Sequence, residues 1–451
     1  MRVGRSFQTP LASLKREPQA PSQGQSREEI FESDKSPQKE WTFLFYNATQ
    51  GALSTMATES LNDLERVGSD ENTNVVVLNQ RERGAHERLL GRFAQYEGTR
   101  TYYVTKQDKP STRSLLGESL GSLADLAFSG PNKVKSEVIS SSTEKESLKT
   151  FLLKNMKRFP ARRYALVMTG HGAAFQGQLI TRDEEGRRAL SNDEIGKVLR
   201  EVAAENGQGV DLVNLNTCFS ANMETLFSLK DSTRAIVASQ SELALRTQPF
   251  GAVLSEAQKR LKGGDLGAEE LAGLFVEKAS EQPLSELYTP SLSAFQAEEI
   301  GNLGKTVEEL QKSCMEQGVA PALIRECLSD ALSVDFAHSP RKVELADLGS
   351  VAAVMAEKIS DPSVKRAAGK VQESLKRSVL AEQHSTPEGE SLLSRAVRKL
   401  PYLVGPQKSL KGSTGLTVFW DPAEKERHAF IEASDFGREH PIRGFMDYLA
   451  G

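Results

Sequence analysis

The sequence contains few cysteines and little net charge, and each scarcity excludes a class of protein. Only Cys218, Cys314 and Cys327 occur in 451 residues, with no CxxC pair and no cysteine and histidine at metal-ligand spacing. A disulfide framework is therefore excluded, and no metal site is predicted. The 57 basic and 61 acidic residues give a net charge of −4, so no basic field attracts nucleic acid or an anionic membrane.

Long hydrophobic runs are also lacking. No apolar run approaches the ~18 residues that a membrane-spanning helix requires, and the first residues contain no apolar signal-peptide core. We therefore expect no membrane span and a cytoplasmic chain, or a secreted one if a leader was removed. Residues 1–39 are rich in Pro, Ser, Gln, Lys and Glu, which predicts a disordered tail or pro-segment.

Short apolar runs alternate with helical patterns through residues 40–260. The run WTFLFYN at 41–47 has the length of a buried strand. Ser191, with Glu194 three residues later, predicts the start of a helix that Gly207 ends. Such alternation predicts an α/β domain, a three-layer α/β/α sandwich around a mostly parallel central sheet.

Residues 261–451 have mostly helical patterns, rich in Leu, Ala, Glu and Lys. A final apolar run, STGLTVFW, predicts a strand near 413–420. We expect a largely helical C-terminal region that returns this strand to the first domain.

Two residues that could do chemistry follow strands of the predicted sheet. His171 lies between Gly170 and Gly172 directly after one apolar run, and Cys218 ends the next long run, VDLVNLNTC. The carboxyl ends of parallel strands meet at one edge of a sheet, where free backbone amides gather. A helix beginning after Cys218 would also favour the thiolate. The pair predicts a base and a nucleophile on neighbouring loops, as in a cysteine hydrolase.

Each of these residues alone also has an ordinary structural explanation. A single histidine is often a core or surface residue, and a cysteine at a strand end is often a small buried hydrophobe. Cys314 and Cys327 lie in the helical region without a comparable setting. We expect both to be packing residues.

Several blocks of the sequence, taken in order, resemble the clostripain family of cysteine peptidases, relatives of caspases, gingipains, legumain and separase. WTFLFYNATQ is similar to the family's opening strand, RYALVMTGHG to its histidine block, and VDLVNLNTCFSANMETLFSLKD to its cysteine block. AIVASQSE, VELADLGSV and GLTVFW are similar to later blocks. The resemblance extends from Trp41 nearly to the end of the chain.

The resemblance implies a cysteine endopeptidase with a caspase-like catalytic domain. Cys218 would attack the peptide carbonyl, and His171 would protonate the leaving amine and later assist water. The backbone amides of Gly172 and Cys218 would stabilise the oxyanion. Asn47 matches a position from which relatives could orient the histidine, and an asparagine that only turns the loop is an equal alternative.

The sequence departs from the family at positions that select P1, the residue before the cleaved bond. Most relatives cleave after Arg or Lys and carry an acidic residue two positions before the cysteine, where this chain has Asn216. A second acidic position aligns near Arg246, and a solvated surface arginine is the alternative there. Because a buried unpaired cation costs several kcal/mol, we expect Arg and Lys at P1 to be disfavoured.

Many relatives are activated by a cut between the histidine and the cysteine. Residues 180–190, ITRDEEGRRAL, are charged and contain glycine, as an exposed loop does. They offer Arg187 and Arg188 to a basic-specific peptidase and the acidic residues 183–185 to an acid-specific one. The alternative is a turn that is never cut.

The expected partner is a protein or peptide substrate, and the oligomeric state is left open. No cofactor is expected. Some relatives bind calcium, but no EF-hand-like spacing of carboxylates occurs, so calcium also stays open. The alternative function is a catalytically silent, caspase-like binding or scaffold module, and the retention of His171 and Cys218 favours the enzyme.

Overall fold

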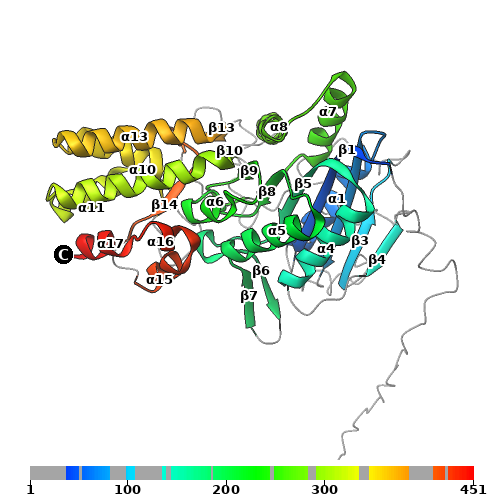
Figure 1. Cartoon of the computed structure of the whole chain (residues 1–451), viewed down its shortest axis with the longest axis horizontal. Coiled ribbons are helices and arrows are strands. Elements are labelled where there is room, and N and C mark those ends of the chain that lie inside the picture. Colours follow the sequence, from blue (N-terminus) through cyan, green and yellow to red (C-terminus); the bar gives the residue numbers. More distant parts are fainter. Residues whose placement is uncertain are drawn as a thin grey trace, which may run out of the picture. The chain divides into compact units, whose positions relative to one another are not determined.

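Nine strands of the described residues form one sheet in the computed structural model (Figure 1). The structure describes residues 37–49, 53–81, 98–106, 135–138, 144–183, 186–243, 248–282, 291–334, 345–384, 410–421 and 425–451. These residues belong to one compact unit, Lys35–Gly451. The tail expected at 1–39 lies outside the described residues up to residue 36.

The strand order across the sheet is β13-β10-β9-β8-β5-β1-β2-β3-β4. The strands are β1 (Lys39–Thr49), β2 (Thr73–Arg81), β3 (Gly98–Tyr103), β4 (Lys135–Val138), β5 (Ala161–Thr169), β8 (Leu212–Asn216), β9 (Ala235–Ala238), β10 (Ser291–Gln296) and β13 (Val379–His384). Neighbours from β2 to β9 pair in parallel, whereas β3 and β10 run antiparallel to the strands beside them. The centre of the sheet is therefore parallel, as the sequence predicts.

Helices cover both faces of this sheet (Figure 1). One layer contains α1 (Ser54–Glu65), α7 (Phe250–Gly263) and α8 (Ala268–Ser280), and the other contains α4 (Glu144–Arg158), α5 (Asn192–Asn206) and α6 (Met223–Leu229). Alternate residues of a strand point to opposite faces, so Phe45 packs with the first layer and Tyr46 with the second. The α/β/α sandwich expected from the sequence is confirmed.

Helix α5 begins and ends where the sequence predicts. Ser191 Oγ accepts a hydrogen bond from Glu194 N (3.2 Å), and Glu194 Oε2 accepts one from Ser191 N (2.9 Å). This capping box satisfies two backbone donors that the first turn leaves free. Gly207 ends the helix with a φ of 76°, a left-handed conformation that glycine adopts without strain.

The residues after 282 are mostly helical but also add strands. The helices are α10 (Ala297–Glu316), α11 (Pro321–Asp330), α12 (Leu348–Lys358), α13 (Pro362–Ser378), α15 (Lys425–Ala433), α16 (Asp435–Glu439) and α17 (Arg443–Ala450). Strands β10 and β13 extend the main sheet. These two strands were not expected.

The strand expected near 413–420 exists as β14 (Thr417–Phe419), but it does not join the main sheet. It pairs with β12 (Leu345–Asp347), which also pairs with β11 (Ser333–Val334). Because β10 already pairs with the edge of β9, that edge of the parallel strands is not free for β14. A single bridge between Asn222 and Thr417 connects β14 to the loop before α6.

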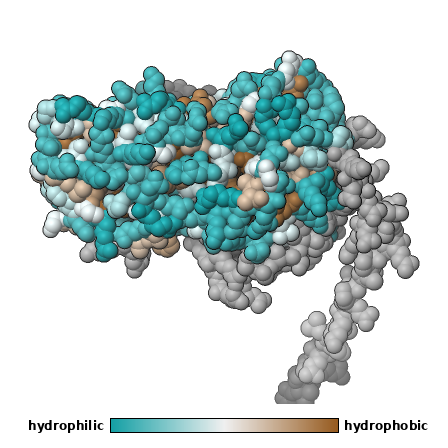
Figure 2. All heavy atoms as spheres, viewed as in Figure 1, coloured by the Kyte–Doolittle hydropathy of each residue, from teal (hydrophilic) through white to brown (hydrophobic). Residues whose placement is uncertain are grey.

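The face drawn in Figure 2 is mostly hydrophilic, with hydrophobic residues scattered over it. Among the described residues, the exposed large hydrophobic side chains are Leu380 (37%) and Phe430 (50%). Single exposed hydrophobic residues are normal on folded proteins and mark no interaction site by themselves. Within the described ranges, no helix has the length and apolar character needed to cross a membrane.

Candidate active site

The parallel pairing of β5 and β8 brings the loops of His171 and Cys218 together. Thr169, the last residue of β5, lies opposite Asn216, the last residue of β8. His171 and Cys218 each follow two residues later. Both residues therefore lie beyond the carboxyl ends of neighbouring strands, at the edge where the sequence places them.

The backbone of Gly172 lies directly against the backbone of Cys218. A Cβ atom added at Gly172 would be 2.2 Å from the carbonyl oxygen of Cys218 and 3.0 Å from its amide nitrogen. Only glycine fits this contact, because a real Cβ would overlap the carbonyl oxygen. The two amides expected to hold the oxyanion thus belong to chain segments in direct contact.

The chain turns sharply after Cys218. Phe219 has a φ of 53°, a left-handed conformation that costs a residue other than glycine roughly 1–2 kcal/mol. Phe219 N donates to Ser241 O (3.1 Å), and Ser220 Oγ donates to Thr217 O (3.0 Å). These bonds hold the strained turn and so fix the direction of the Cys218 side chain.

The Cys218 thiol is partly buried and bonds to the loop that follows β9. Leu243 N donates to Cys218 Sγ (3.3 Å), and the sulfur lies 3.7 Å from Leu243 O. Burial raises the pKa of the Cys218 thiol to about 11, although the Leu243 N–H opposes this shift. The thiolate was expected to be favoured by a helix dipole, but α6 begins only at Met223, beyond the reach of that effect. The Cys218 side chain is therefore a neutral thiol near pH 7.

Asn216 and Asn47 belong to a row of polar side chains at the carboxyl end of the sheet. Asn79, Asn47, Thr169 and Asn216 lie in register on four neighbouring strands, so their side chains share one face. Asn216 Nδ2 donates to Thr169 Oγ1 (3.3 Å), and Asn216 Oδ1 accepts from Gln248 Nε2 (3.2 Å). The amide at the expected P1 position is therefore held by neutral groups.

The structure does not bring every residue that the sequence singles out into contact with His171 or Cys218. Asn47 Nδ2 donates to Asn79 Oδ1 (2.8 Å), and Asn47 Oδ1 has no hydrogen-bond partner, so Asn47 does not orient the exposed His171 by a hydrogen bond here. Its orienting role stays a prediction. Arg246 falls among residues 244–247, outside the described part of the chain.

Residues 180–190 form most of a β-hairpin rather than an irregular loop. Strand β6 (Gln178–Asp183) pairs antiparallel with β7 (Gly186–Leu190), which contains Arg187 and Arg188. The two-residue tip lies outside the described residues. Along the chain, the hairpin lies between the short 3₁₀ helix η2 (Ala174–Gln176), which follows His171, and helix α5, which leads to β8.

The other two cysteines are packing residues, as expected. Cys314 is buried in α10 and Cys327 in α11. Burial also raises the pKa of the Cys314 thiol to about 12. Neither side chain is accessible for chemistry.

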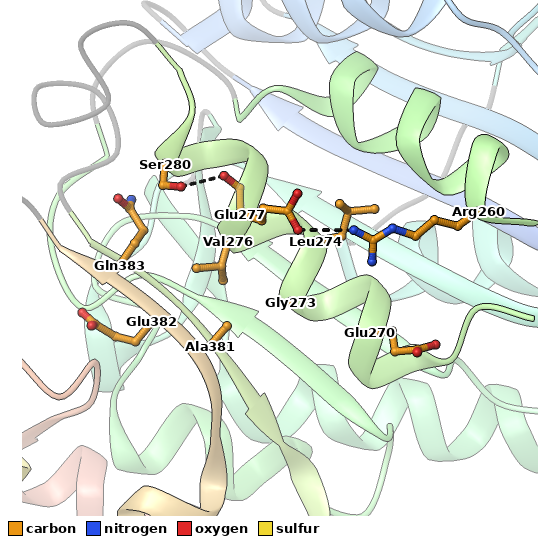
Figure 3. Close-up of a pocket in the computed structure, with 10 residues that line it drawn as sticks. All are labelled: Arg260, Glu270, Gly273, Leu274, Val276, Glu277, Ser280, Ala381, Glu382 and Gln383. Atoms are coloured by element: carbon orange, nitrogen blue, oxygen red, sulfur yellow. Dashed lines mark hydrogen bonds and ion pairs between the residues drawn. The ribbon is translucent and has the colours of Figure 1, made fainter.

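A cavity of about 440 Å³ lies between α8 and β13 (Figure 3). Arg260 Nη2 on its rim pairs with Glu277 Oε2 (3.3 Å), and Ser280 Oγ donates to Glu277 O (2.7 Å). None of the candidate catalytic residues lines this cavity. Within the part of the chain that the structure describes, no group of three or more His, Cys, Asp or Glu side chains is placed to hold a metal ion.

Several buried polar residues near the site were missed by the sequence analysis. Thr217 Oγ1 donates to Gln178 Oε1 (2.7 Å), and Gln248 bonds to Asn216. These pairs are 39 and 32 residues apart along the chain, so no local pattern could have found them.

Glu224, which appeared only as part of the cysteine block, is buried, and burial raises the pKa of its carboxyl to about 7.

The sandwich, with a histidine loop and a cysteine loop at the carboxyl edge of its sheet, defines the class of caspase-like cysteine peptidases. The sequence model of the clostripain family matches residues 53–408, which is most of the chain. The protein belongs to the clostripain family and is a cysteine peptidase of that family. No curated protein matches the chain significantly in a sequence search.

Solved structures share the fold over nearly their whole length. A secreted cysteine protease from Bacteroides thetaiotaomicron, in complex with an irreversible peptide inhibitor, has a TM-score of 0.58 at 14% identity, covering 90% of this chain and 99% of that chain. An inactive zymogen protease from Parabacteroides distasonis has a TM-score of 0.56 at 13% identity, covering 90% of this chain and 99% of that chain. These similarities establish the shared fold.

Proposed function

We propose that the protein is a cysteine endopeptidase in which Cys218 is the nucleophile and His171 the general acid and base. The sulfur attacks the peptide carbonyl carbon while His171 accepts the thiol proton, and His171 then gives this proton to the leaving amine. Water, deprotonated by His171, attacks the resulting thioester, the C–S bond breaks to release the second peptide product, and His171 returns the proton to Cys218 Sγ. The observation that carries the proposal is the backbone contact between Gly172 and Cys218, because it brings the two loops within reach of one substrate.

The raised pKa of the Cys218 thiol supports a proton transfer from the thiol to His171 as the first step. At neutral pH the Cys218 thiol, with a pKa of about 11, is protonated almost completely before substrate binds. His171 is exposed and lies on the neighbouring loop, a place from which it can accept the thiol proton during the attack.

The oxyanion of the tetrahedral intermediate would bind to the amides of Gly172 and Cys218. Both amides lie beyond strand ends, and Gly172 has no side chain to cover its N–H. In other hydrolases, removal of one such donor lowers kcat by roughly 10²- to 10³-fold.

The P1 pocket would be neutral in the part formed by Asn216. This side chain bonds to Thr169 and Gln248, and none of the three carries a charge that could compensate a buried lysine or arginine. We therefore propose uncharged or acidic residues at P1. Arg246 keeps its proposed role as a cation beside the pocket.

The hairpin β6–β7 is the proposed processing site, and Arg187 and Arg188 are its proposed basic residues. The Parabacteroides relative is described as an inactive zymogen, which supports processing in this chain as well. The Bacteroides relatives are described as secreted. The expected cytoplasmic location gains no support from these proteins, and we propose that this protein also acts outside the cell on peptides or proteins.

The decisive experiment compares the cysteine and histidine variants on a peptide library with all residues at P1. Cys218→Ala and His171→Ala are each expected to reduce cleavage by at least about 10³-fold, as in other nucleophile–base pairs. Cys314→Ala, the same chemical change at a buried cysteine of α10, is the matched control and keeps full activity. Circular dichroism checks that all variants fold.

Two outcomes would contradict the proposal. Cleavage by Cys218→Ala at the wild-type rate would show that another residue is the nucleophile. A folded, processed wild-type protein that cleaves no member of the library and leaves Cys218 unmodified by peptide electrophiles would instead identify the silent binding module.

A further inference from the structure

We propose that Gln178 is a positioning residue for this peptidase, because its buried side chain fastens the histidine loop to the residue before Cys218. The inference rests on the proposed function of these two loops. It goes beyond that function by naming a residue that touches neither the substrate nor the reacting atoms.

The Gln178 side chain is fully buried and bonds to both loops. On the cysteine side, Thr217 Oγ1 donates to Gln178 Oε1 (2.7 Å). On the histidine side, Gln178 Nε2 donates to Ala174 O (3.2 Å) and to Asn192 Oδ1 (3.4 Å). Asn192 Nδ2 in turn donates to Ala174 O (3.4 Å). The amide thus uses its acceptor for one loop and its donors for the other.

Gln178 also supports Gly172 directly. A Cβ atom added at Gly172 would be 2.7 Å from Gln178 Oε1, and the same atom would overlap the backbone of Cys218. Gly172 and Gln178 form an antiparallel bridge, and Ala173 N donates to Gly177 O (3.0 Å) next to it. A change in the position of the Gln178 side chain would therefore shift the Gly172 amide relative to Cys218.

The backbone around these contacts is strained. Within the described residues, the non-glycine residues with positive φ are Ala174 (54°), Leu179 (52°) and Phe219 (53°). Such conformations persist only where surrounding contacts enforce them, and they gather at functional sites. Gln178 bonds to the carbonyl of Ala174 and directly precedes Leu179, so its side chain holds one of these three residues and lies next to a second.

The contacts of Gln178 lie at the base of the hairpin and not at its tip. Gln178 opens β6 and pairs with Leu190, the last residue of β7, while Asn192 is the first residue of α5. A cut at the tip would place Gln178 and Asn192 on different pieces without removing any bond between them. The arrangement can therefore hold the two loops before and after processing.

The test is the Gln178→Met variant of the full chain, assayed on the best substrate of the peptide library. Methionine preserves the length of the side chain but provides none of the three hydrogen bonds. We expect kcat to fall by roughly 10- to 100-fold while KM changes less than about threefold, because a misplaced oxyanion donor affects the transition state more than substrate binding.

Gln311→Met is the matched control. Gln311 is also buried, but it lies in α10 and its Nε2 atom has no hydrogen-bond partner. We expect wild-type kcat and KM from this variant. An equal loss of kcat in Gln311→Met would overturn the inference, because general loosening of the core would then explain both results.

A second pair of variants keeps the test informative if Gln178→Met does not fold. Thr217→Val removes only the hydroxyl that donates to Gln178, whereas Thr217→Ser retains it. Thr217→Val is expected to lower kcat in the same way, and Thr217→Ser to keep kcat near the wild-type value. Equal kcat in the two Thr217 variants would overturn the inference.

Hydrogen exchange separates this inference from the proposed function. The backbone amides of residues 170–179 are expected to exchange at least about tenfold faster in Gln178→Met than in Gln311→Met, whether or not the protein cleaves peptides. If the wild type is inactive and this difference is present, the proposed function fails while the positioning of the loop stands. Unchanged exchange in Gln178→Met would overturn the positioning role.

Discussion

The chemistry of the Cys218 thiol depends strongly on the folded structure. With a pKa of about 11, its alkylation by iodoacetamide at pH 7 is expected to be slow and to rise about tenfold per pH unit until about pH 10, because the thiolate is the reactive form. Peptide mass spectrometry after timed alkylation measures this profile. Cys314 and Cys327 serve as internal controls and are expected to react more slowly still, because both are buried. A rate that is already maximal at pH 7 would contradict the raised pKa.

Asn216 allows a test of P1 specificity at one position. Asn216→Asp would place a carboxylate where Gln248 Nε2 and Thr169 Oγ1 can donate to it. Opposite charges 4 Å apart attract by roughly 4 kcal/mol at an effective dielectric constant near 20, and desolvation offsets part of this. We expect kcat/KM for Arg substrates, relative to the best neutral P1, to rise at least about tenfold.

Asn214→Asp is the control for this specificity change. Asn214 lies on the same strand and also bonds to Gln248. It precedes Asn216 by two residues, so it lies farther from the carboxyl end of β8. It should lower stability without changing the P1 preference. Efficient Arg cleavage by the wild type would show that other residues form the pocket.

Glu224 makes the stability of the protein depend on pH. Burial raises the pKa of this carboxyl from 4.5 to about 7, and Glu224 Oε2 has no hydrogen-bond partner. The unfolded chain therefore ionises this group at lower pH than the folded one, and stability decreases as pH rises from about 4.5 to 7. Because one pKa unit corresponds to about 1.4 kcal/mol, the full loss is about 3 kcal/mol.

The Glu224→Gln variant tests this dependence by urea unfolding at pH 5 and pH 8. The variant is expected to gain about 1–3 kcal/mol over the wild type at pH 8 and much less at pH 5. Glu256→Gln is the control, and the change in stability expected from it at pH 8 has the opposite sign. Hydrogen bonds from Arg260 and Lys259 lower the pKa of Glu256. Replacing this carboxylate by an amide is therefore expected to destabilise the fold slightly at pH 8. If the difference in unfolding free energy between Glu224→Gln and the wild type were the same at pH 5 and pH 8, the raised pKa of Glu224 would be contradicted.

Among the secondary-structure elements, the hairpin β6–β7 is the one that processing would change. We expect one cut within residues 180–190, with both pieces remaining together. The pairing of β5 with β8 joins the two pieces across the buried sheet, as do the contacts of Gln178 with Thr217 and Asn192. Intact-mass spectrometry after size-exclusion chromatography would find two fragments in one peak.

The Arg187→Ala and Arg188→Ala double variant tests which residue directs this cut. If a basic-specific peptidase makes this cut, the double variant is expected to stay intact and inactive. Wild-type enzyme added to the double variant is then expected to leave it uncut as well. Full activity of an uncut wild-type chain would remove processing from the mechanism and leave the catalytic assignment untouched.

At the scale of the whole molecule, the C-terminal half completes the central sheet. Strand β10 pairs with β9, and β13 pairs with β10, while Phe295 and Ile300 enter the core beside Ile236. We expect a fragment of residues 37–282 to be insoluble or to lack cooperative unfolding, because it exposes the edge of β9 and part of the core.

Coexpression of residues 283–451 in the same cells is the control and is expected to restore a soluble complex. Cooperative thermal unfolding of 37–282 alone, followed by circular dichroism, would show instead that the first domain predicted at 40–260 folds independently. The division at residue 260 stays a prediction until this is measured.

The sequence by itself determined the features that depend on neighbouring residues. The ends of α5 follow from Ser191, Glu194 and Gly207, and the alternation of strands and helices predicts the parallel centre of the sheet. Two glycines after one strand and a cysteine after the next placed His171 and Cys218 at the same edge. These features are local, because caps, turns and strand periodicity involve residues only a few positions apart.

Only the tertiary structure decided the features that depend on residues distant along the chain. The pKa of Cys218 follows from burial and from Leu243, 25 residues away. Gln178 meets Thr217 across 39 residues, and β10 rather than β14 pairs with the edge of β9. Burial and long-range pairing arise from the whole fold, and short-range sequence patterns do not encode them.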